Sequence, residues 1–122
     1  MLPEDRDAAY LFEIVRAAVD IAGFLEGISF GNYLKDEMRR AAVERKLELI
    51  GEGVRKLSGT FKDAHPEIPA DKIVGMRNIL AHRYYEIDHS IIWKIATVEV
   101  PTLRAALAPL IPPIPPDPEP EP

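Results

Sequence analysis

Apolar residues recur at steps of three and four along most of the chain, which is the spacing of one buried face on an α-helix. This spacing predicts a first helix from Asp7 to about Leu25. A second, longer helix is expected to follow, with Asn32 as its N-cap and its end near Ser58. The apolar positions of the two helices are Leu11, Ile14, Val15, Ala18, Ile21, Ala22 and Leu25, then Val43, Leu47, Ile50, Val54 and Leu57.

Two glycines, Gly51 and Gly53, lie inside the second predicted helix. Each glycine in a helix interior lowers helix stability by about 1 kcal/mol relative to alanine. Their presence therefore indicates that another helix packs closely against this backbone. That helix could belong to a dimer partner.

A loop rich in glycine and proline is predicted over residues 59–69, and a short third helix over about residues 70–82. A fourth helix begins after Asp88, its expected N-cap, and Pro101 is expected to kink it or divide it in two. The apolar side of this fourth helix is formed by Ile91, Ile92, Ile95, Val98, Leu103 and Leu107.

The predicted helices end where a proline-rich tail begins. Proline dominates residues 109–122 and leaves too few backbone N–H groups for a helix, so an extended or disordered tail is expected. The helical domain would then span residues 1–108. Four helices with no strand pattern and no repeat predict an all-α fold, an up-and-down four-helix bundle or a close variant of it.

Composition and charge narrow the functional classes. The chain has no cysteine, which excludes a disulfide framework, a thiolate zinc site and a cysteine nucleophile. The formal net charge is −5, and the three acidic residues of the tail contribute −3, so the body carries only −2. This near balance argues against sequence-blind nucleic-acid binding, and DNA is not an expected partner.

The N-terminus is acidic and lacks the features of a signal peptide. Charged residues interrupt every apolar stretch before it reaches the ~20 residues that a transmembrane helix requires. We therefore expect a soluble, cytoplasmic protein with no membrane partner.

Four polar residues, Arg77, Asn78, His82 and Tyr84, lie around the end of the third predicted helix. Asn78 and His82 are four residues apart and share a face, whereas Arg77 lies about 140° around the axis from His82. The arginine must therefore reach across to the imidazole, or a second subunit must help close the gap. Histidine can transfer protons near neutral pH and arginine can bind phosphate, which suffices for metal-independent RNA cleavage by the 2′-hydroxyl group.

A structural interpretation of the same residues stays open, and on spacing alone it is favoured. Histidine near a helix C-terminus complements the helix dipole, and neighbouring arginine or tyrosine often only packs or caps. A metal site is not expected, because His65 and His89 lie in other loops and no acidic pair accompanies His82 at ligand spacing. No cofactor is expected either.

Arg77, four intervening residues, His82, one residue and Tyr84 resemble the signature of HEPN-domain ribonucleases, in which a polar residue such as Asn78 is also typical. Three segments are similar to the HepT toxin branch and occur in the same order. They are RAAVERKLELIGEGVRKLS from Arg40, HPEIPADKIVGMRNILAHRYYEID from His65, and IIWKI. The resemblance covers roughly residues 5–107.

This resemblance implies a HEPN-like four-helix bundle that forms a homodimer with both motifs facing a shared cleft. It implies a metal-independent endoribonuclease that acts on RNA as the toxin of a toxin–antitoxin pair. The antitoxin would be a cognate minimal nucleotidyltransferase, which transfers AMP from ATP to a tyrosine of the toxin motif. The attached phosphate and base would then block the cleft.

Position by position, the resemblance implies that Arg77 holds the scissile phosphate and that Asn78 assists it. It implies that His82 acts in proton transfer. Tyr84 would be the acceptor of AMP. Arg83 adds a candidate RNA phosphate contact, although a solvated surface charge is the preferred interpretation of it.

The chain departs from the branch pattern at IPADKI, where an aromatic residue often follows the proline. Ala70 is therefore expected to leave that corner less packed. Glu44 and Arg45 are interpreted as interface or surface charges rather than catalytic groups. Two other functions remain open: a non-catalytic HEPN module that binds a nucleotide or the nucleotidyltransferase, and a dimeric helical adaptor in which the motif is a buried polar brace.

Overall fold

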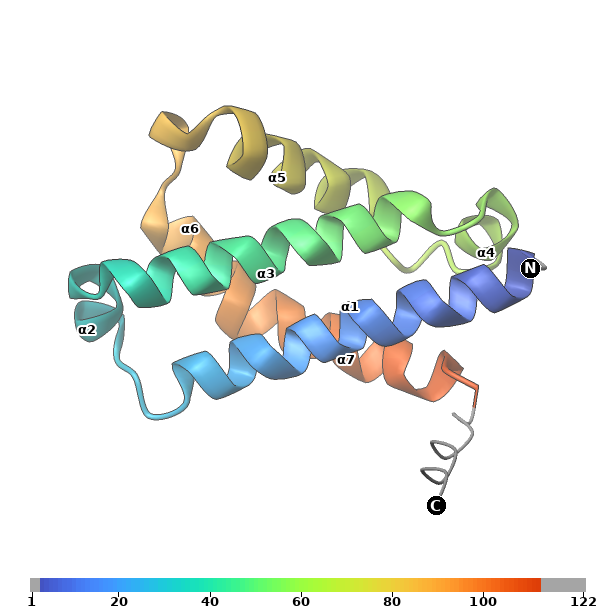
Figure 1. Cartoon of the computed structure of the whole chain (residues 1–122), viewed down its shortest axis with the longest axis horizontal. Coiled ribbons are helices and arrows are strands. Elements are labelled where there is room, and N and C mark those ends of the chain that lie inside the picture. Colours follow the sequence, from blue (N-terminus) through green and yellow to red (C-terminus); the bar gives the residue numbers. More distant parts are fainter. Residues whose placement is uncertain (1–2, 113–122) are drawn as a thin grey trace, which may run out of the picture.

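The computed structural model describes residues 3–112, without the side chains of residues 3–5 and of Tyr84. Within this range the chain contains helices and turns and no strand, as the sequence predicts (Figure 1). The expected disorder of the tail stays a prediction, because residues 113–122 lie outside the described part.

Four long helical segments run alternately in opposite directions and form an up-and-down bundle (Figure 1). They are α1 (Pro3–Leu25), α3 (Glu37–Lys56), α5 (Ala70–His82) and a composite segment of α6 (His89–Lys94), η2 (Ile95–Glu99) and α7 (Val100–Leu107). Shorter elements connect or extend them: α2 (Phe30–Lys35), α4 (Gly59–Ala64), η1 (Tyr84–Glu86) and η3 (Ala108–Leu110).

The core forms mainly between α1 and α3, which lie side by side along their length (Figure 1). Most of the predicted apolar positions are buried there, and Ile21, Val43, Leu47 and Val54 have no exposed surface. Each such side chain contributes about 1.5–3 kcal/mol through burial. Ala22 is an exception, because it is exposed.

The predicted second helix is divided in two, and Asn32 is not its N-cap. Ser29 begins α2, since its hydroxyl accepts a hydrogen bond from the Asn32 N–H at 3.2 Å. Asp36 then leaves the helical conformation and caps α3 by accepting from the Arg39 N–H at 3.0 Å. This second cap satisfies a backbone donor that a break in the helix would otherwise leave unpaired.

The predicted loop over residues 59–69 contains the short helix α4. Ser58 caps it, with its hydroxyl accepting from the Phe61 N–H at 3.1 Å. Asp7 fixes Ser58 in turn, because its carboxylate accepts from the Ser58 N–H at 2.7 Å and from the hydroxyl at 2.6 Å. The start of α1 is therefore tied to the start of α4.

The last helical segment is divided into α6 and α7 directly before Pro101, as the sequence predicts. The dividing element is η2, a π-helical stretch, in which the Val100 N–H donates to the Ile95 carbonyl five residues earlier. A wider turn of this kind tolerates a nearby proline, which has no backbone N–H to donate to the preceding turn. Asp88 caps α6 as predicted, accepting from the Ser90 N–H at 2.9 Å. Leu110 and Ile111 pack against the core, so the folded part continues past residue 108.

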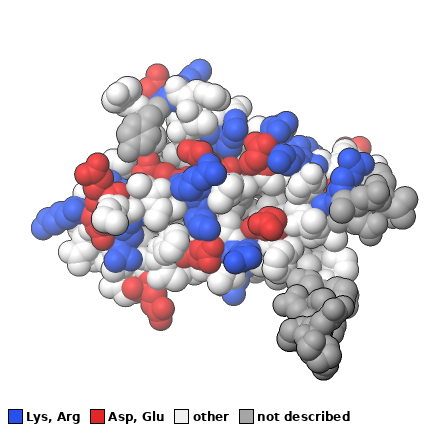
Figure 2. All heavy atoms as spheres, viewed as in Figure 1, with Lys and Arg blue, Asp and Glu red and all other residues white. Residues whose placement is uncertain are grey.

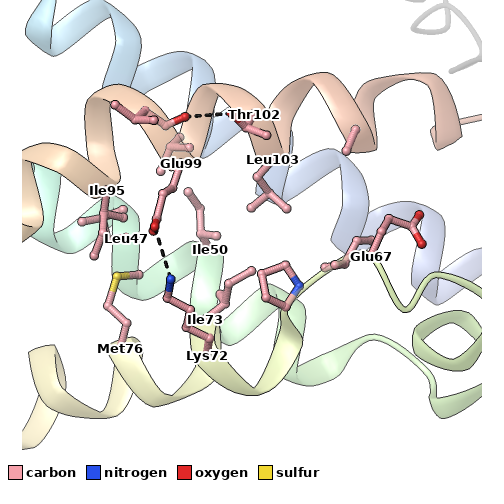
Figure 3. A pocket seen from close by; sticks show the side chains of 15 residues that line it. Leu47, Ile50, Glu67, Lys72, Ile73, Met76, Ile95, Glu99, Thr102 and Leu103 are labelled. Atoms are coloured by element: carbon pink, nitrogen blue, oxygen red, sulfur yellow. Dashed lines mark hydrogen bonds and ion pairs between the residues drawn. The ribbon is translucent and has the colours of Figure 1, made fainter.

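An apolar cavity of about 360 Å³ lies between α3, α5 and α7 (Figure 3). Its lining includes Ile68, Pro69 and Ile73, whereas Ala70 itself packs against the core, so looser packing of that corner stays a prediction. Lys72 and Glu99 form an ion pair across it, with 3.2 Å between Nζ and Oε1.

Basic and acidic side chains are interspersed on the face shown in Figure 2, in line with the balanced charge of the body. No helix among the described residues is long and apolar enough to cross a membrane.

Candidate active site

Helix α5 has a buried face and an exposed face. Leu80 is buried, and Ile73, Val74 and Met76 pack against the core. Asn78 and His82 are exposed and line one open, shallow pocket together with Gly75, Ile79 and Arg83. The predicted shared face of Asn78 and His82 is therefore confirmed.

Arg77 lies on a different side of α5 and points toward α3. Its Nη2 atom lies 3.4 Å from Oε2 of Glu52, and its Nη1 atom donates to Oδ1 of Asn78 at 3.1 Å. The described contacts of Arg77 do not include His82. Asn78 connects the two, since it holds the guanidinium group and shares the pocket of His82.

Gly51 explains how Arg77 fits against α3. A β-carbon at residue 51 would lie 2.3 Å from the β-carbon of Arg77 and 3.3 Å from the carbonyl oxygen of Ile73. Gly53 is similarly close to α1, where an added β-carbon would lie 2.6 Å from Cγ1 of Ile14. The predicted close packing is confirmed, and both neighbours are helices of the same chain.

Three positively charged side chains surround the carboxylate of Glu52. Besides Arg77, its carboxylate contacts Nη2 of Arg55 at 2.6 Å and Nζ of Lys56 at 3.8 Å. The Arg55 hydrogen bond, followed by the charges of Arg55, Arg77 and Lys56, lowers the pKa of Glu52. The carboxylate therefore stays ionised at neutral pH. Glu52 is a site residue that the sequence did not predict, although its place directly after Gly51 was a usable signal.

The motif continues beyond the end of α5. His82 is the last residue of the helix and is exposed. The Arg83 N–H donates to the Ile79 carbonyl at 2.8 Å, while the Arg83 side chain is exposed and lies 3.8 Å from the Glu86 carboxylate. The Arg83 side chain is therefore an exposed charge at the edge of the His82 pocket, and its contact with an RNA phosphate stays a prediction. Tyr84 begins η1, and its side chain lies outside the described residues.

The other two histidines, His65 and His89, do not line this pocket. His65 stacks against Phe61 with ring centroids 4.5 Å apart, and its Nδ1 atom lies 3.2 Å from the Glu67 carboxylate. His89 begins α6. Among the described residues, no three His, Cys, Asp or Glu side chains are grouped so that they could hold a metal ion.

Glu44 is buried, with 5% of its surface exposed, so its interpretation as a surface charge is wrong. It lies next to Val43 and three residues before Leu47 on the core face of α3. Arg45 is exposed and pairs with Glu48 at 3.4 Å, which agrees with the prediction for that residue.

Comparisons with known proteins identify the family. The family described as ribonuclease HepT-like matches residues 14–110. A Methanocaldococcus jannaschii protein named as a candidate RNase is 38% identical over 79% of this chain and 88% of its own length. A Thermococcus cleftensis protein named "Probable ribonuclease HepT" is 37% identical over 78% of this chain and 86% of its own length. No solved structure matches the chain significantly.

The helical bundle and these matches define the class as the HEPN-type helical proteins. Within that class, the chain belongs to the HepT-like ribonuclease family.

Proposed function

We propose that this protein is a metal-independent endoribonuclease, the toxin of a toxin–antitoxin pair, with Arg77, Asn78 and His82 as its catalytic residues. The observation that carries the proposal is the arrangement at the end of α5. Asn78 contacts the Arg77 guanidinium group at 3.1 Å and lines the same exposed pocket as His82. Family membership and the names of the relatives support a ribonuclease.

The proposed reaction is a transesterification within the RNA backbone. His82 accepts the proton of the 2′-hydroxyl group, and the 2′-oxygen forms a bond to phosphorus as the bond to the 5′-oxygen breaks. The leaving 5′-oxygen takes up a proton from solvent water, and the products carry a 2′,3′-cyclic phosphate and a 5′-hydroxyl. Arg77 stabilises the negative charge on the phosphoryl oxygens, and Asn78 holds Arg77 in place.

We further propose that the protein acts as a homodimer. The pocket of His82 is shallow in one subunit, and its lining includes Gly75 and the apolar side chain of Ile79, which is 40% exposed. A second subunit on this face would bury Ile79, deepen the pocket and bring two motifs together. Such a cleft would exclude water around the phosphate and strengthen its pairing with Arg77.

The proposed antitoxin is a minimal nucleotidyltransferase that attaches AMP to Tyr84. Tyr84 begins η1 only two residues after His82, so the attached group would lie beside the pocket. Its phosphate would compete with the RNA phosphate for Arg77, and its base would obstruct access to His82. RNA as substrate and the absence of cysteine suit a cytoplasmic location.

The cleavage assay uses purified, unmodified protein, single-stranded RNA and EDTA. We expect cleavage by the wild type and a loss of at least about 100-fold in His82→Ala, the usual contribution of general acid–base catalysis. His65→Ala is the matched control, because His65 contacts Phe61 and Glu67 instead of the pocket. Tight binding of ATP or of the nucleotidyltransferase without any RNA cleavage would replace the proposal with a non-catalytic binding module.

The modification assay is co-expression with the nucleotidyltransferase, followed by intact mass and peptide mapping. We expect an AMP addition on the peptide that contains Tyr84 and its loss in Tyr84→Phe. Tyr85→Phe is the control, because residue 85 is adjacent but lacks the motif spacing. A stable complex with no AMP on the protein would show inhibition by binding instead.

A further inference from the structure

The apolar cavity between α3, α5 and α7 has the size of a small-molecule site. Its volume of about 360 Å³ lies at the lower end of the range of about 300–1,000 Å³ that is usual for ligand pockets. Its wall is mostly apolar, and Figure 3 shows the side chains of Ile50, Ile73 and Leu103 around the open space. The cavity shares no lining residue with the His82 pocket, so it is a separate site.

Four of the lining side chains are polar, and two of these already have partners of their own. The Glu67 carboxylate lies 3.2 Å from Nδ1 of His65, and Figure 3 shows it directed away from the open space. The Thr102 hydroxyl donates to a backbone carbonyl of its own helical segment at 2.9 Å. Lys72 and Glu99 are therefore the polar groups that an entering molecule would meet.

Lys72 of α5 and Glu99 of η2 face each other across the cavity, with 3.2 Å between Nζ and Oε1 (Figure 3). Their side chains are 70% and 42% exposed, so the ion pair lies at the mouth in contact with water. An exposed pair of this kind contributes little to stability, and the two side chains can part at small cost. A ligand that separates them must then supply a partner for each charge.

This requirement selects the head group of the ligand. A molecule with a single charge would pair with Lys72 or Glu99 and be repelled by the other. A neutral apolar molecule would offer neither charge a partner. An α-amino acid carries an ammonium group and a carboxylate on the same carbon atom, so it can form a charge-assisted hydrogen bond with both residues. The apolar wall then favours an apolar side chain, which gains free energy by leaving water.

The backbone at Glu99 gives a second, independent indication of a functional site. The π-helical stretch η2 contributes Ile95, Val98 and Glu99 to the lining of the cavity. Such stretches within α-helical segments occur frequently at functional sites. The irregular part of the last helical segment therefore coincides with the wall that carries one of the two charges.

We propose that the cavity binds one apolar α-amino acid. The side chain of the ligand lies against the apolar wall, its ammonium group pairs with Glu99, and its carboxylate pairs with Lys72. The proposal goes beyond the nuclease function and does not rest on it, because it concerns binding at a separate site.

Isothermal titration calorimetry of the full chain with L-leucine tests the proposal. We expect saturable binding at one site per chain. Leucinamide lacks the carboxylate and N-acetylleucine lacks the ammonium group, so each should bind about tenfold more weakly than leucine. Equal binding of the three compounds would show a purely apolar pocket and overturn the proposal.

Two variants assign each charge of the ligand to its partner. Lys72→Gln should weaken leucine binding about tenfold and leave leucinamide binding unchanged, because leucinamide has no carboxylate to lose. Glu99→Gln should do the same for leucine and N-acetylleucine. Both side chains are exposed, so both variants are expected to fold. Equal weakening of all three compounds in either variant would contradict the assigned pairing.

A substitution at the rim tests the location. Ala106 is exposed and lines the cavity, so Ala106→Phe should fill the mouth and abolish leucine binding. Ala105→Phe is the matched control, since Ala105 is also exposed on α7 but does not line the cavity. Leucine binding that survives Ala106→Phe would overturn the proposal. The absence of leucine binding to the full chain would overturn it too, including the case in which a second copy covers the mouth.

Discussion

Gly51 of α3 and Arg77 of α5 lie so close that a β-carbon on residue 51 would be 2.3 Å from the β-carbon of Arg77. The proposed phosphate-binding arginine is therefore placed by the packing of two helices rather than by a loop. This close approach also brings the guanidinium group within 3.4 Å of Glu52, the residue after Gly51.

Gly51→Ala should lower the free energy of unfolding by about 1–3 kcal/mol, because the added methyl group forces α5 away from α3. The same shift should reduce RNA cleavage by displacing Arg77. Gly23→Ala is the control, since a β-carbon there meets nothing within 4 Å, and it should stabilise the protein by up to about 1 kcal/mol. Urea denaturation measures both, and equal effects of the two substitutions would contradict the account.

Glu52→Gln should separate binding from catalysis in the proposed nuclease. Glu52 holds Arg77 in one direction and also neutralises part of its charge. We expect kcat to fall about tenfold, because a loosened guanidinium group stabilises the transition state less well. KM should not rise, since the pocket becomes more positive toward RNA. Steady-state cleavage kinetics measure both, and a higher KM with unchanged kcat would refute this role.

Ile79→Glu should convert the proposed homodimer to a monomer without destabilising the subunit. Ile79 is 40% exposed in a single chain, so a charged side chain can stay in water unless a partner covers it. Val19→Glu is the control, because Val19 is 42% exposed but lies on α1. Sedimentation velocity should show a monomer only for Ile79→Glu. A dimer in all three proteins would place the interface elsewhere.

The burial of Glu44 predicts a specific pH dependence of stability. Its pKa is raised in the folded state, so the folded protein holds the proton more tightly than the unfolded chain does. This favourable contribution is present below the ordinary carboxyl pKa and is lost as pH rises through the raised value. The stability of the wild type relative to Glu44→Gln should therefore fall as pH rises from the ordinary carboxyl pKa of about 4 through the raised value. Urea denaturation at several pH values measures it, and a constant difference would contradict the assignment.

The long elements of the fold could be predicted because their periodic apolar positions decide them locally. The start and end of α5 and the cap at Asp88 also follow from the sequence. The division at Asp36 and the short helix α4 could not be predicted in this way. Helix α4 depends on Ser58, which Asp7 holds from 51 residues away in the sequence.

In the candidate site, too, features set by local spacing could be predicted, and features set by helix packing could not. The shared face of Asn78 and His82 follows from their spacing on one helix. The roles of Glu44 and Glu52 depend on which helices cover α3, so their charges alone gave no indication of burial or of contact with Arg77.

The chemistry of the RNA ends shows directly whether the 2′-hydroxyl group is the nucleophile. Unmodified protein is incubated with RNA in EDTA, and the fragments are analysed by mass spectrometry beside those from His82→Ala. We predict fragments with a 2′,3′-cyclic phosphate and a 5′-hydroxyl from the wild type and none from His82→Ala. Fragments with a 5′-phosphate, or the same fragments from both proteins, would contradict cleavage by the 2′-hydroxyl group with His82 as the proton acceptor.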